Sequence, residues 1–221
     1  MKTLRISFIG RIISCYTHEM KNYLAIIKET NGLMKDVIEI GKSRSFDAKH
    51  FMGFVGCVEE QVGRATALTD YLYRFAHRME SELASVNIND LLDELVALVN
   101  RLAYRKRISF KKDLNGGMPA TILNPVLFHY FMFCMIETRM NALDRNSVIS
   151  VGTSYSNGCF RIALLSEGPA MPQADSGETG SVGDMENIAS ELGAVIFQHG
   201  SETVITMPAV THNNIDAGKC T

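Results

Sequence analysis

The stretch "CYTHEMKNYLAII", residues 15–27, combines apolar residues at helical spacing with a histidine, a glutamate and an asparagine in five consecutive positions, 18 to 22. A helix turns by about 100° per residue, so His18 falls about 180° from the apolar stripe that runs through Met20 and Ile27. The spacing therefore predicts that His18 lies on the outer, solvent-facing side of a helix.

Three polar side chains surround this predicted position of His18. Asn22 follows one helical turn later on the same face, and Glu19 and Lys21 flank it on either side. An amphipathic helix needs polar residues on its outer face, and a histidine there is often only solvated. A functional interpretation of His18 therefore depends on the rest of the chain.

The helical pattern extends in both directions from this stretch. Apolar residues recur at intervals of three and four from about residue 4 to residue 40, which predicts one long helix. The polar segment "GKSRSFD" follows, and a second apolar seam predicts a helix from about Ala48 to Leu83. The two helices are expected to form an antiparallel hairpin. A hairpin of this length leaves apolar surface uncovered, so we expect a homodimer whose two hairpins form a four-helix bundle.

The pattern changes after Ser85. The segment "NINDLLDELVALVNRLAYRKR" predicts a third helix, and "ISFKKDL" and "PATIL" predict strands around the turn "NGG". An apolar helix is expected from about Pro125 to Leu143. The alternating segments "VISVGTSY" and "CFRIALLS" then predict two strands joined by the turn "SNG".

The last part of the chain completes an α+β fold. A polar, glycine-rich loop from Glu167 to Gly183 precedes a short helix that ends near Leu192, and "AVIFQHGSETVITMP" predicts a hairpin. We expect an α/β sandwich of helices against an antiparallel or mixed sheet. The predicted domains are a helical hairpin over 1–85, the sandwich over 86–210 and a polar tail over 211–221.

Composition limits the functional classes. A chain of 221 residues, 46% of them hydrophobic, supports a globular fold, and a net charge of −2 argues against a nucleic-acid partner. The longest apolar run, "VLFHYFMFCMI", is shorter than the roughly 20 residues of a membrane span, and no signal peptide is predicted. The five cysteines are odd in number and lack CxxC pairing, which favours free thiols in a cytoplasmic protein.

The segment "HEMKNYLAII" resembles the H-box of dimeric sensor histidine kinases, which typically reads H-E-[LI]-[RK]-[NT]-P-L on the first helix of a dimerising hairpin. The proline departs from this pattern, since Tyr23 stands in its place. The resemblance identifies His18 as the phosphoacceptor and Glu19 as the residue that serves as a base in that family. Lys21 would offset phosphate charge, and Asn22 would hydrogen-bond the transferring group or orient a water molecule.

A second segment, "ILNPVLFHYFMFCMIETRMNAL", resembles the helix that carries the N-box in the ATP-binding domain of these kinases. Asn124 and Pro125 stand at the Asp-Pro position that introduces this helix. Cys134 and Thr138 fall where the family has the two N-box asparagines. Thr138 is a poorer metal ligand than an amide, so this resemblance implies a weakened Mg²⁺ site.

The segment "LLSEGPAMP" resembles the G1 box, D-x-G-x-G-[IM]-P, with Gly168, Met171 and Pro172 retained. Ser166 replaces the aspartate that binds the adenine amino group in the family, and Ala170 replaces the second glycine. The G2 glycines have no counterpart in "TGSVGDMEN". Without Mg²⁺ and these groups the phosphates lose their charge neutralisation, so we expect no ATP binding and no cofactor of the chain's own. Glu137 and Asn141, each within a turn of Thr138, are the alternative metal ligands.

The first functional hypothesis is a histidine phosphotransfer protein. His18 would accept a phosphoryl group from the aspartyl phosphate of a response-regulator receiver domain and pass it to another such aspartate, with Mg²⁺ supplied by the receiver. Imidazole is a good nucleophile when it is neutral. Glu19 would then hydrogen-bond the ring and set its tautomer.

Two alternatives stay open. One is a non-catalytic pseudokinase scaffold that binds a receiver or a kinase, and the other is a divergent active histidine kinase. The other histidines, among them His129 and His199, lack ligand spacing and are interpreted as surface or packing residues. The basic stretch from Arg101 to Lys112 is interpreted as a solvated helix end.

Overall fold

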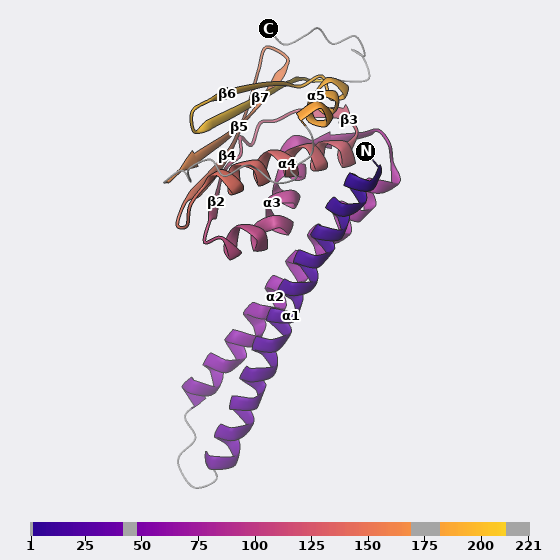
Figure 1. The fold of residues 1–221 in the computed structure, drawn as a ribbon. Coiled ribbons are helices and arrows are strands. Elements are labelled where there is room, and N and C mark those ends of the chain that lie inside the picture. Colours follow the sequence, from indigo (N-terminus) through magenta and orange to yellow (C-terminus); the bar gives the residue numbers. More distant parts are fainter. Residues whose placement is uncertain (1, 42–47, 169–181, 211–221) are drawn as a thin grey trace.

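The computed structural model describes residues 2–41, 48–168 and 182–210 (Figure 1). Two long helices, α1 (Lys2–Gly41) and α2 (Ala48–His77), form the antiparallel hairpin that the apolar spacing predicts. One half of this hairpin lies beside the rest of the molecule, and the other half projects away from it (Figure 1). The predicted polar tail, 211–221, lies outside the described residues.

The near half of the hairpin shares its core with the α/β part. Phe8 of α1 and Phe75 of α2 are buried, and their rings meet edge to face with centroids 5.8 Å apart. Phe8 also lies 4.9 Å from the ring of Phe133, which belongs to α4 (Pro125–Ala142). Apolar burial of this kind therefore holds the start of α1 against the sandwich.

The prediction that the second helix runs to Leu83 is wrong. Helix α2 ends at His77, and a short 3-10 helix, η1 (Arg78–Glu80), leads into strand β1 (Ala84–Asn87). Strand β1 pairs antiparallel with β3 (Ala120–Leu123), which lies far along the chain. The local apolar pattern carries no information about this distant partner, and tertiary pairing overrides it.

The second sheet has five strands in the order β2-β4-β5-β7-β6 and is mixed, since β2 and β4 run parallel and every other neighbouring pair is antiparallel. Its strands are β2 (Ser109–Asp113), β4 (Val148–Ser156), β5 (Cys159–Glu167), β6 (Val195–His199) and β7 (Glu202–Pro208). Strands β2 and β3 flank the "NGG" turn as expected. They do not pair with each other, because each belongs to a different sheet.

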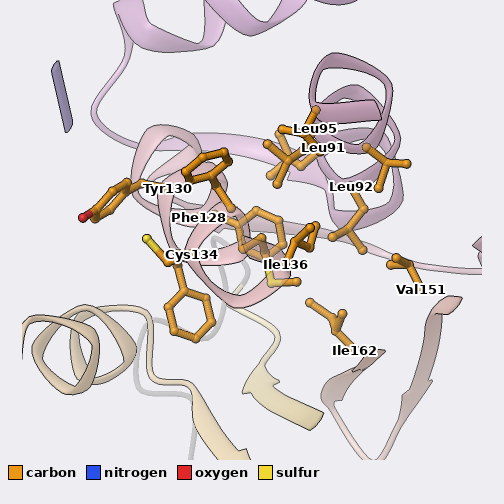
Figure 2. Close-up of a cluster of buried hydrophobic side chains, with 14 of the residues drawn as sticks. Leu91, Leu92, Leu95, Phe128, Tyr130, Cys134, Ile136, Val151 and Ile162 are labelled. Atoms are coloured by element: carbon orange, nitrogen blue, oxygen red, sulfur yellow. The ribbon is translucent and has the colours of Figure 1, made fainter. Parts of the chain in front are cut away.

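Helices α3 (Ile88–Arg105), α4 and α5 (Val182–Glu191) lie beside this sheet (Figure 1). Figure 2 shows Phe128 of α4 among Leu91 and Leu95 of α3, with Val151 and Ile162 of the sheet nearby, and all five are buried. A helix with apolar residues on all sides is expected to lie inside a core, and α4 does so. The chain is thus an N-terminal helical hairpin followed by a mixed α/β sandwich, as predicted.

None of the helices in the described ranges has both the length and the hydropathy that crossing a membrane requires. Cys15, Cys57 and Cys134 carry free thiols, as expected, whereas Cys159 is disulfide-bonded, which the sequence interpretation did not anticipate.

Candidate functional site

His18 lies on α1 with its side chain exposed, as the helical periodicity predicts. Lys21 is exposed as well, and Glu19 and Asn22 are half-buried. These four residues therefore occupy the outer side of the helix and its border with the sandwich. Exposure of the imidazole is the first requirement for exchange of a group with a second protein.

The structure adds a residue to this set that the sequence interpretation missed. Arg101 of α3 places its Nη1 3.2 Å from the Oε1 of Glu19 and its Nη2 3.4 Å from the Nε2 of His18. Its side chain is only 19% exposed. The interpretation of the stretch from Arg101 to Lys112 as a solvated helix end is therefore wrong at its first residue.

The contact with Arg101 has a chemical consequence for the imidazole. A guanidinium group carries only donors and stays protonated in proteins. When His18 is neutral, Nε2 can join this contact only as the acceptor, so the ring proton resides on Nδ1. Arg101 thus favours the tautomer in which Nδ1 carries the proton and Nε2 carries the free lone pair.

A cavity of about 200 Å³ adjoins His18 between α1 and α3. Its lining residues are Arg11, Ser14, Cys15, His18, Arg101, Leu102 and Arg105. Burial raises the pKa of the Cys15 thiol, and the nearby positive charges of Arg11, Arg105 and Arg101 oppose this rise. The positive charges of these three arginines therefore act on the Cys15 thiol, which lines the cavity.

Arg11 connects this cavity to α4. Its guanidinium forms an ion pair with Glu137 and lies 4.9 Å from the ring centroid of Phe133. Asn141, one turn after Glu137, accepts a hydrogen bond of 2.6 Å from the Nζ of Lys106. Both alternative metal ligands from the sequence analysis are therefore already paired with cationic side chains.

The residues at the N-box positions line a different and larger cavity, of about 820 Å³, between α4, α5 and β6. Thr138 is exposed and lines it, as does Cys134, whose pKa burial raises to about 11. Arg139 also lines it and donates hydrogen bonds to Thr203 and to the backbone oxygen of Gly200. Among the described residues no cluster of histidine, cysteine, aspartate or glutamate could hold a metal ion.

The two described residues at G1-box positions, Ser166 and Gly168, do not line this cavity. Ser166 is buried at the end of β5, and its Oγ has no hydrogen-bond partner in the described part of the chain. Gly168 has a φ of +135°, and a Cβ there would clash with the Oγ of Ser147. Ala170, Met171 and Pro172 lie outside the described residues.

No protein family model and no curated protein matches the sequence. Two nucleotide-free crystal forms of the catalytic domain of histidine kinase ThkA have structures similar to that of this chain. The match covers 60% and 59% of this chain and 100% of each of those chains. Their identities are 14% and 16%, and each TM-score is 0.50. The histidine kinase ThkA in complex with response regulator protein TrrA is similar over 93% of this chain and 63% of that chain, with 15% identity and a TM-score of 0.49. At these identities the likeness shows the fold alone: the α/β part of this chain has the fold of a histidine kinase catalytic domain.

Proposed function

We propose that this protein is a histidine phosphotransfer protein of a two-component phosphorelay, with His18 as the residue that carries the phosphoryl group. The observation that supports this most is the exposed imidazole of His18, whose Nε2 faces Arg101 and whose neighbour Glu19 is bound by the same guanidinium. This arrangement leaves a nucleophilic nitrogen beside positive charge at the surface of a helical hairpin.

The proposed partner is the receiver domain of a response regulator that carries an aspartyl phosphate. The Nε2 lone pair of His18 forms a bond to phosphorus while the bond from phosphorus to the aspartate oxygen breaks, and that electron pair returns to the carboxylate. The Nδ1 proton is then released. The same steps in reverse pass the phosphoryl group to a second receiver, and Mg²⁺ bound to the receiver would neutralise charge on the phosphoryl oxygens.

Lys21 and Asn22 have supporting roles in this proposal. The exposed ammonium group of Lys21 would attract the acidic, phosphate-bearing site of the receiver. The half-buried amide of Asn22 would donate a hydrogen bond to the transferring group or orient a water molecule. Glu19, held by Arg101, would help to position the guanidinium that sets the tautomer of His18.

We further propose that the chain does not phosphorylate itself from ATP. Thr138 stands at an N-box position with only a hydroxyl to offer a metal ion, and Ser166 lies buried away from the cavity that Thr138 lines. Glu137 is bound by Arg11, and Asn141 is bound by Lys106. A Mg²⁺ ion would have to displace one of these cations, so the sandwich is better suited to support the hairpin than to bind a nucleotide.

A homodimer is part of the proposal because apolar side chains remain exposed along the hairpin. Ile13 and Leu24 lie eleven residues apart on α1, which places them on one face, and both are exposed. Val62 on α2 is exposed as well. Pairing with a second copy into a four-helix bundle would cover such side chains.

One experiment separates the proposal from its alternatives. The pure protein is incubated with a receiver domain carrying labelled phosphate and, in a second reaction, with labelled ATP and Mg²⁺. Label from the receiver on the wild type and on a His199→Ala control, but not on His18→Ala, is the expected result. Label from ATP would instead identify an active kinase, and no label from either donor would identify a scaffold.

A further inference from the structure

The cavity between α1 and α3 has an excess of positive charge next to the reactive nitrogen. Three arginines line it, and two of them have carboxylate partners: Arg11 binds Glu137 and Arg101 binds Glu19. Arg105 is exposed and forms no ion pair with any residue that the structure describes. The group therefore retains one positive charge that no carboxylate of the described residues balances.

The orientation of Arg101 suggests where an anion would bind. Its Nη1 is directed to Glu19 and its Nη2 to the Nε2 of His18, so both ends of the guanidinium fork are in use. Its Nε is buried and has no hydrogen-bond partner among the described residues. A buried donor without a partner is unfavourable, and an incoming acceptor at this place would relieve it.

Arg105 has room to move toward the same place. It lies one helical turn after Arg101 on α3, so the two side chains share a face. Besides the cavity at His18 it lines a second cavity of about 580 Å³, which also borders on Arg101. Its guanidinium can therefore turn toward a charge at His18 without displacing packed side chains.

We propose that this cavity is a phosphoryl-binding site, in which Arg101 and Arg105 bind the phosphate group carried on Nε2 of His18. The proposal rests on the proposed function only in taking His18 as the phosphorylated residue. A phosphoryl group bonded to Nε2 takes the position that faces Nη2 of Arg101, and its oxygens accept the hydrogen bonds that arginine donates best. Phosphorylation thereby links α1 to α3, and a receiver that takes the phosphate has to replace these contacts.

The test uses phosphoramidate, which phosphorylates histidine without any protein partner. The Nε2 lone pair of His18 bonds to phosphorus, the P–N bond of phosphoramidate breaks, ammonia leaves with that electron pair, and the Nδ1 proton is released. The pKa of the phosphoryl group is then measured by ³¹P NMR across pH 5.5 to 9, in the folded protein and in urea. Nearby arginines favour the dianion, so the pKa in the folded wild type is expected to lie below the value in urea by about half a pH unit.

Matched substitutions identify the source of this shift. Arg105→Gln and Arg101→Gln are each expected to move the pKa back toward the value in urea. Arg64→Gln, which removes an exposed arginine paired with Glu60 on α2, is expected to leave the pKa unchanged. Equal titration of the folded and unfolded phosphoprotein, or an equal pKa in the wild type and in both cavity variants, would overturn the proposal. Arg105 is exposed, so Arg105→Gln is expected to fold even if Arg101→Gln does not.

Two further results distinguish this proposal from others. Inorganic phosphate is titrated against unphosphorylated His18→Ala protein, and a rise in Tm that Arg105→Gln abolishes would mean that the site takes free phosphate rather than phosphohistidine, which overturns the assignment. Transfer to a receiver is assayed separately. If the pKa of the phosphoryl group is lowered in the folded protein but no transfer occurs, the proposed function is refuted and the phosphoryl site stands. If transfer occurs but the pKa is not lowered, the phosphoryl site is refuted and the proposed function stands.

Discussion

At the scale of single residues, His18 and His129 differ in exposure and in the groups that they contact. His18 is exposed and contacts a guanidinium, whereas His129 of α4 is fully buried, with its Nε2 3.1 Å from the backbone oxygen of Leu91. Burial lowers the pKa of His129 to about 3, so this ring is neutral and donates to the carbonyl. His129 is therefore a packing residue, as its lack of ligand spacing suggested, whereas His18 is the histidine that we propose for phosphoryl transfer.

The buried His129 makes stability depend on pH. Its pKa is about 3 in the folded state and near 6.5 in the unfolded state, so the unfolded chain binds one more proton between these values and the folded state loses stability as pH falls. His129→Gln keeps a donor for Leu91 and removes the titration. We expect urea unfolding to show a pH dependence between pH 6 and 4 that is smaller by about 1 kcal/mol per pH unit in this variant. The control is His199→Gln, which replaces an exposed histidine and is expected to keep the pH dependence of unfolding of the wild type. Equal slopes for His129→Gln and wild type would show that His129 does not cause this pH dependence.

The backbone conformation at position 168 requires a glycine. Gly168 combines a φ of +135° with a close approach to Ser147, whereas Gly158 has a φ of +76° in open space. We expect Gly168→Ala to lower the free energy of unfolding by about 3 kcal/mol and Gly158→Ala by about 1 kcal/mol. Chemical denaturation of both variants measures the difference. Equal decreases in the free energy of unfolding would show that the contact with Ser147 does not add to the cost of a side chain at position 168.

At the scale of elements, the connection from the hairpin to the sandwich depends on a buried carboxylate. Glu94 of α3 is 1% exposed, and Arg78 of η1 binds it through Nε at 2.9 Å and Nη2 at 2.8 Å. Arg74 of α2 lies 3.6 Å from the same carboxylate. The last turn of α2 and the 3-10 helix are thereby fixed to α3, which also carries Arg101.

Removal of one arginine from this buried group is expected to be costly. Arg78→Met leaves Glu94 with incomplete compensation in a buried position, and we expect the free energy of unfolding to fall by about 3 kcal/mol. The control is Arg161→Met, since Arg161 pairs with Glu202 at 3.0 Å on the exposed surface and such pairs contribute only about 0–1 kcal/mol. Similar losses in the two variants, measured by urea denaturation, would contradict the role assigned to Glu94.

The same region shows which elements the sequence could predict. Apolar periodicity repeated over many turns identified α1 and α3, and a continuous apolar run identified α4. The end of α2 and strand β1 could not be predicted, since β1 exists through pairing with β3 and η1 is held by Glu94. Arg101 was missed for a related reason: its partners His18 and Glu19 are more than 80 residues away in sequence, and only the folded chain brings them together.

At the scale of the whole molecule, the exposed apolar residues of the hairpin predict self-association. Leu24→Glu places a charge on the face that we propose to be covered by a second copy, so the dimer is expected to dissociate into monomers in sedimentation experiments. Phe197→Glu changes an equally exposed apolar residue, 56% against 57% exposed, on strand β6 of the sandwich, and is expected to leave the dimer intact. A wild-type protein that sediments as a monomer would refute the four-helix bundle.

The site as a whole was partly predictable. The exposure of His18 followed from periodicity alone, and the H-box resemblance supplied Glu19, Lys21 and Asn22 as its neighbours. The pairing of Glu137 and Asn141 with cations and the arginine-lined cavity depend on contacts between α1, α3 and α4. No pattern within one helix encodes these contacts.

If His18 carries the phosphoryl group, the phosphate must be found on this residue after transfer from a receiver domain. The protein is incubated with a phosphorylated receiver, digested at alkaline pH, where phosphohistidine survives, and mapped by mass spectrometry. We expect a single phosphorylated peptide from this chain, modified at His18 and absent in His18→Ala. Phosphate at any other residue, or its persistence in His18→Ala, would contradict this prediction.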